Sequence, residues 1–90
     1  MTDNEKILTL DSTIARIQTE IAAVETERRA QQAELQAALL AGEDPAPLAE
    51  AVQARIERLT VLHLLMDEAN TLAGQLRAAI FRVEMAAGNG

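Results

Sequence analysis

Cysteine is absent from this chain of 90 residues, and aromatic residues nearly so, with one Phe and neither Trp nor Tyr. Without cysteine, neither disulfides nor thiolate metal sites can form. The longest nearly apolar run, residues 59–66, falls far short of the roughly 20 residues that a membrane span needs. The polar segment 1–6 predicts no secretory signal peptide. We therefore expect a cytoplasmic protein that does not interact with membranes.

Positive charge is also scarce, and the chain has a formal net charge of −6. Residues 1–45 hold nine acidic and four basic side chains, a net of −5, whereas residues 46–90 hold five and four, a net of −1. A nucleic-acid backbone requires a basic footprint, so we expect no nucleic-acid binding. The acidic first half is suited either to solvent or to a basic surface on a protein partner.

Helix-forming residues dominate what is present, and the apolar ones recur every three or four positions. This period is typical of α-helices, and no segment alternates as a strand would. We expect one domain spanning residues 1–90. It holds helix 1 at about 4–41, a turn at 42–45, helix 2 at about 45–87 and a short tail at 88–90.

Capping residues mark the predicted helix ends. Thr2 and Glu5 have the spacing of a capping box, in which each side chain accepts a backbone N–H of the first turn. Gly42 is suited to the left-handed conformation that follows a helix. Asp44 is a favourable N-cap for helix 2, with Pro45 at the first helical position.

The two predicted helices carry apolar ladders that mirror one another. The first ladder occupies residues 10, 14, 17, 21 and 24, and the second, read backwards, occupies residues 79, 76, 72, 69 and 65. If the chain reverses at the turn, the two ladders face each other in this order. The sequence therefore predicts an all-α fold, an antiparallel two-helix hairpin with coiled-coil-like packing.

Helix 2 carries a second stripe, which mixes apolar and polar residues: Ile56, Leu59, His63, Met66, Asn70, Ala73, Arg77 and Ile80. A small hairpin without disulfides or metals commonly needs further association to be stable. We therefore expect a homo-oligomer, most simply a dimer of hairpins that forms a helical bundle. The predicted interface residues are Ile56, Leu59, Met66, Ala73 and Ile80.

The polar members of this stripe, His63, Asn70 and Arg77, are spaced by seven residues and share one helix face. Two interpretations compete. In the first, they fix the alignment and the number of subunits, as polar residues at core positions do. In the second, they line a pocket between subunits that holds a partner or an anionic or heterocyclic ligand such as a nucleotide phosphate, with Arg77 donating charge-assisted hydrogen bonds.

Arg28 and Gln31 continue the helix 1 ladder where apolar residues are expected, and the mirror places them opposite Leu62 and Leu59. Arg28 can lay its stem on the seam with its charge in water. It can also pair with Glu25, with Gln32 or with an acid of another subunit, or bind a ligand or partner. Both the structural and the binding interpretation of this pair stay open.

Catalytic motifs are missing. The single histidine, His63, lies four residues before Asp67, a spacing that is more typical of an ordinary helix contact than of a catalytic pair. The Glu-x-x-His repeats of di-iron bundles do not occur, and neither does a glycine-rich phosphate loop. We expect no enzymatic activity, no metal site and no cofactor.

One segment resembles a known family. Asp44-Pro45-Ala46-Pro47-Leu48-Ala49-Glu50, followed by a helix that reaches Ala78-Ala79-Ile80-Phe81, is similar to the turn and second helix of type III secretion needle subunits. The two prolines are two residues apart here and typically three apart in that family. The resemblance implies a small hairpin that polymerises as part of a secretion apparatus.

Three functions follow as hypotheses. The first is a non-enzymatic oligomeric interaction protein, such as an adaptor, chaperone or inhibitor, that binds a protein partner. The second is a ligand-sequestering oligomer of the kind that phages or plasmids encode. It would bind nucleotide-type molecules between subunits through His63, Asn70, Arg77 and Arg28. The third is the polymerising secretion subunit. We favour the first.

Overall fold

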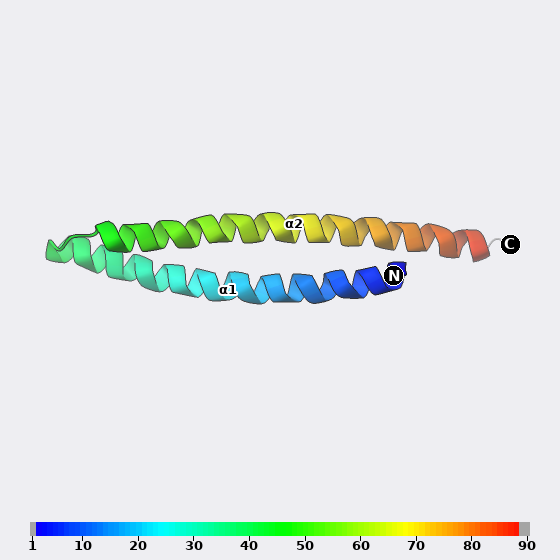
Figure 1. Ribbon diagram of the computed structural model, residues 1–90, viewed down its shortest axis with the longest axis horizontal. Coiled ribbons are helices and arrows are strands. Elements are labelled where there is room, and N and C mark those ends of the chain that lie inside the picture. The colour runs from blue at the N-terminus through cyan, green and yellow to red at the C-terminus, as the bar shows by residue number, and fades with distance from the viewer. Residues whose placement is uncertain (1, 89–90) are drawn as a thin grey trace.

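Two long helices, joined by a short turn, make up the computed structural model, which describes residues 2–88. Helix α1 comprises Asp3–Ala41 and α2 comprises Ala46–Gly88. They pack antiparallel along a rod of 75 × 16 × 14 Å (Figure 1). Within the described residues there is no strand. The predicted all-α helical hairpin is confirmed.

Thr2 caps the start of α1 as the sequence predicts, and of the capping box the bond that the Thr2 side chain accepts is observed. The Thr2 hydroxyl accepts the backbone N–H of Glu5 at 3.2 Å, and the Thr2 carbonyl accepts that of Lys6 at 3.0 Å. The Thr2 hydroxyl thereby satisfies one of the backbone donors that a helix N-terminus leaves without internal partners, and the bond from Lys6 is the first intrahelical one. Asp3 and Glu5 add negative charge at the positive end of the helix dipole.

Gly42 ends α1 in the left-handed conformation, with φ of 72°. Its N–H donates to the Leu39 carbonyl at 3.3 Å, and the N–H of Glu43 donates to the Ala38 carbonyl at 3.0 Å. These two bonds form a Schellman motif, which satisfies carbonyls that would otherwise lack donors. A residue with a Cβ is strained at this φ, so glycine determines where α1 stops.

Helix α2 begins one residue later than predicted. The Pro45 carbonyl accepts the N–H of Ala49 at 2.9 Å, the first helical hydrogen bond, so Pro45 precedes the helix instead of opening it. The Asp44 carboxylate accepts the N–H of Ala46 at 3.1 Å and closes the turn. At the other end α2 includes Gly88, which we had assigned to the tail, and residues 89–90 of that tail lie outside the described residues.

The core is a single seam between the helices. A cluster of Ile17, Val24 and Leu62 forms its centre, and Ile21, Leu59 and Met66 pack against this cluster. Seven residues are buried in total within the described chain: Ile17, Val24, Ala38, Val52, Leu62, Ala69 and Ala73. The residues of the seam follow intervals of three and four on both helices, as in a coiled coil.

The predicted register of the seam was wrong. The sequence mirror placed residues 65–72 opposite 17–24, but in the structure residues 59–66 lie there. Leu65 and Leu72, which we expected inside, are 46% and 49% exposed. The displacement is six residues, one short of a heptad, so α2 is also rotated: Ala69 stays buried, while Met66 and Ala73 replace Leu65 and Leu72 in the seam.

The turn explains this shift. Figure 1 shows that α1 extends beyond the start of α2, so the connecting residues run back along α1 before α2 begins. At the opposite end α2 extends past the start of α1. The sequence mirror assumes that the end of α1 and the start of α2 lie level with each other at the turn. Because they do not, every residue of α2 is displaced relative to α1.

Candidate interaction surfaces

A polar layer interrupts the apolar seam on the turn side of Val24. It contains Arg28 and Gln31 from α1 and Arg55 from α2, all half-buried. The Gln31 side-chain oxygen is buried and accepts no hydrogen bond from the described residues. The Arg55 Nε lies 3.1 Å from a Glu27 carboxylate oxygen, but its buried N–H is not directed at an acceptor. This layer therefore lowers the stability of the seam.

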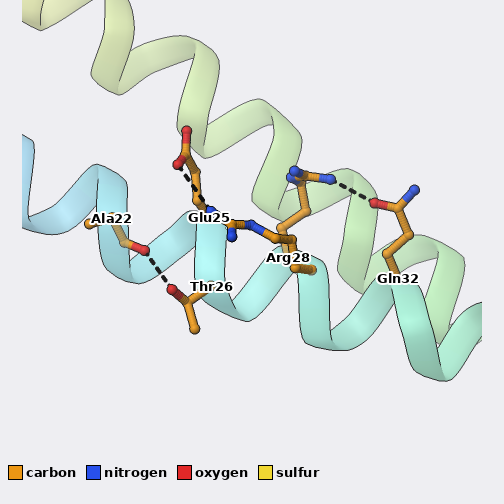
Figure 2. A network of polar contacts seen from close by, with 6 residues as sticks. Ala22, Glu25, Thr26, Arg28 and Gln32 are labelled. Carbon is orange, nitrogen blue, oxygen red and sulfur yellow. Dashed lines mark hydrogen bonds and ion pairs between the residues drawn. The ribbon is translucent and has the colours of Figure 1, made fainter.

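Arg28 forms the contact with Gln32 that the sequence suggested. Its Nη1 donates to the Gln32 side-chain oxygen at 2.6 Å (Figure 2). Glu25, the other proposed acceptor, is paired with Arg29 instead, at 3.6 Å. The Arg28 side chain is half-buried, so its stem covers the seam while its head reaches an exposed neighbour. The contact is local to α1.

The row His63, Asn70 and Arg77 lies on one edge of α2, and all three residues are exposed. The Arg77 Nη2 donates to the Asp11 carboxylate of α1 at 2.8 Å. Arg77 thus ties the two helices together at the edge of the seam. Arg28 belongs to a different part of the rod, beside the polar layer, so the structure does not bring the four candidate residues together within one chain.

Four of the five predicted interface residues face α1 or are half-buried. Leu59 and Met66 pack against the central cluster, Ala73 is only 1% exposed, and Ile80 is half-buried. Of the set, only Ile56 is exposed, at 43%. A second copy cannot reach the buried members while α1 covers them. The stripe that we had assigned to the oligomer therefore belongs largely to the hairpin itself.

A different part of α2 offers apolar surface. We call Val61, Leu64, Leu65 and Leu72 the apolar patch, and their exposed fractions run from 46% for Leu65 to 60% for Leu64. Sequence reasoning placed Leu65 and Leu72 in the seam and so missed the patch. The signal that could have found it is the nearly apolar run 59–66, which no single contact with α1 can cover.

Sequence reasoning also missed the ion pairs that join the helices. Arg58 donates from two nitrogens to one carboxylate oxygen of Glu20, with Nε at 3.1 Å. Arg55 lies beside Glu27. Positions that flank a coiled-coil seam carry such ion pairs. The pairs could therefore have been predicted from the sequence if the seam residues of α2 had been assigned correctly. They place the acidic edge of α1 against the basic residues of α2.

Sites of other kinds are not found within residues 2–88. No pocket is present in this part of the chain, and no group of three or more histidine, cysteine or acidic side chains is arranged to hold a metal ion. Neither helix, over the same residues, has a stretch both long and apolar enough to cross a bilayer. The exposed surfaces of the two helices are what the described chain offers to a partner.

Comparison of the chain with protein-family models, with curated proteins and with solved structures finds no match.

Proposed function

We propose that the protein is a non-enzymatic interaction protein of the cytoplasm, an adaptor, chaperone or inhibitor that acts by packing its helices against those of another polypeptide. The observation that carries this proposal is the apolar patch on α2. Four neighbouring large side chains are at least 46% exposed there, although within residues 2–88 the hairpin fully buries only one large side chain, Leu62.

Exposure of this kind favours binding. Single apolar side chains are common on protein surfaces, but contiguous ones mark places where another surface packs. Val61, Leu64 and Leu65 lie within five residues of one another and so cover adjoining parts of the helix. An amphipathic helix that lays its apolar face along α2 would remove this surface from water.

The edges of the patch are suited to a specific contact. Arg58 lies at one end of it and Glu68 lies between Leu65 and Leu72, and both are exposed. Charged residues beside an apolar centre are typical of the rim of a protein interface, where they select the partner and its orientation. The combination supports protein binding over the sequestration of a small molecule.

Photo-crosslinking in the cells that make the protein tests this function. A photoreactive amino acid in place of Leu64 should yield covalent adducts with a polypeptide, because Leu64 is the most exposed member of the patch. The matched control carries the same group in place of Gln36, which is exposed on α1. Equal and weak crosslinking from both positions would contradict the proposal.

Native mass spectrometry of the purified protein adds a second readout. A complex whose extra mass is a polypeptide, a second copy or a foreign chain, agrees with an interaction protein. Extra mass of the size of a nucleotide would instead support the ligand-sequestering alternative.

A further inference from the structure

Six exposed residues of α2 lie in one row beside the hairpin seam. We call them the α2 row: Ala54, Arg58, Val61, Leu65, Glu68 and Leu72. Their intervals are four, three, four, three and four, so the spacing is the same when it is read from either end. Residues spaced in this way share one side of a helix, and two such rows can meet antiparallel in register.

We propose that the occupant of the α2 row is a second copy of this chain, with its α2 antiparallel to the first. The inference rests on the proposed function and deepens it, because the row includes most of the apolar patch. It replaces the interface that the sequence suggested, which the hairpin itself largely buries.

The row is complementary to itself in this orientation. At its centre Val61 of each copy lies opposite Leu65 of the other. Next to this centre Arg58 lies opposite Glu68, and at the outer ends the small Ala54 lies opposite the large Leu72. Each pairing occurs twice because the arrangement has a two-fold axis. The apolar centre is thus bordered on both sides by opposite charges.

The parallel orientation fails on the same residues. It places Glu68 opposite Glu68, Arg58 opposite Arg58 and Ala54 opposite Ala54. Like charges that face each other repel, and facing alanines leave a gap where leucine would fill the space. The charge pattern of the row therefore selects antiparallel pairing.

Arg58 can serve both contacts. Its Nε and one Nη already donate to Glu20 of the same chain. A guanidinium group has five N–H donors, so donors remain for Glu68 of the second copy. Arg58 would then lie between two carboxylates, one on α1 and one on the neighbouring α2.

The ends of the rod agree with this register. Pairing about the centre of the row sets residue 46 of one copy beside residue 80 of the other, so the two hairpins overlap along nearly their full length.

Sedimentation of the full chain tests the charge pairing. The natural protein should dimerise at micromolar concentrations. Glu68→Arg sets two arginines against each other at two places and should raise the dimer dissociation constant by about tenfold or more. The matched control is Asp67→Arg, which makes the same charge change at the adjacent exposed position, off the α2 row, and should change the constant by less than about twofold.

Disulfide trapping tests the orientation, since the natural chain has no cysteine. Val61→Cys and Leu65→Cys chains are mixed and oxidised. Antiparallel pairing gives mainly the mixed disulfide between the two variants. Parallel pairing gives mainly the two symmetric disulfides, and that result would overturn the proposed orientation.

The outcomes separate this inference from the function on which it rests. A natural protein that stays monomeric up to about 100 μM, well above the range of specific dimers, overturns the second copy as occupant. If Leu64 still crosslinks to a foreign polypeptide in that case, the interaction function stands. Equal effects of Glu68→Arg and Asp67→Arg overturn the register.

Discussion

Glu20 of α1 and Arg58 of α2 are joined across the hairpin, with the Arg58 Nε 3.1 Å from the Glu20 carboxylate. They are 38 residues apart in the chain. The ion pair lies beside the central cluster of Ile17, Val24 and Leu62. It therefore marks the register in which the two helices pack, and that register leaves the apolar patch of α2 exposed.

Replacing Glu20 by Gln should weaken this register only slightly. Both side chains are nearly half exposed, and exposed ion pairs are worth little, so we expect a loss of about 0.5 kcal/mol in the free energy of unfolding. The loss should shrink in high salt. Urea unfolding at two salt concentrations measures it, with Glu34→Gln on the same helix as the control. A loss that is independent of salt would show that Glu20 acts through packing.

Leu62→Ala should be the most damaging single truncation in the seam. Leu62 is 1% exposed and lies in the central cluster, so its removal leaves a cavity that costs about 3 kcal/mol. Leu40→Ala is the control, because Leu40 is 91% exposed, and it should change stability by less than about 0.5 kcal/mol. Thermal unfolding followed by circular dichroism compares the two. Similar melting temperatures for the two variants would show that Leu62 does not lie at the centre of the seam.

Gln31→Leu should raise stability. The Gln31 side-chain oxygen is buried without a donor, and an apolar side chain at this position removes that cost, a gain of about 1 kcal/mol. Gln32→Leu is the control, since Gln32 is exposed and accepts from Arg28. Urea unfolding of both variants gives the comparison. A fall in stability for Gln31→Leu would mean that Gln31 has a partner in the assembled protein.

Replacement by alanine should lower the stability of the protein at one glycine and raise it at another. Gly42 has φ of 72°, so Gly42→Ala is strained and should cost about 1 kcal/mol. Gly74 lies inside α2 with open space where an alanine Cβ would lie, so Gly74→Ala should add about 0.5–1 kcal/mol through helix propensity. Thermal unfolding checks both. Loss of stability at Gly74 would indicate that another helix packs closely there.

The helices and their ends followed from local sequence signals. Thr2 caps α1 and Gly42 ends it, as predicted, because a cap depends on the few residues whose backbone groups it satisfies. The side of α2 that faces α1 was not predicted. Leu65 and Leu72 continue an apolar ladder as regular as the one that contains Leu62 and Met66, so spacing alone did not distinguish them.

The predicted and observed ladders share Leu62 and Leu59 toward the turn, where the observed seam continues through the half-buried Arg55 to Val52. They diverge beyond Leu62, where the observed seam has Met66 and Ala73 in place of Leu65 and Leu72. The same error affected the candidate binding residues. His63 and Asn70 are exposed on one edge of α2, whereas Ala73 and Met66, which we assigned to the outer surface, face α1.

By itself, the sequence determined two helices, their caps, the turn and hence an antiparallel hairpin. These features depend on residues within a few positions of each other, because local hydrogen bonds and backbone conformation determine where a helix begins and ends. Only the tertiary structure decided the register, the face of α2 that α1 covers and therefore the surface left for binding. The register depends on all of these contacts together, because the burial of every apolar side chain along the rod is balanced against the desolvation of charged residues such as Arg55.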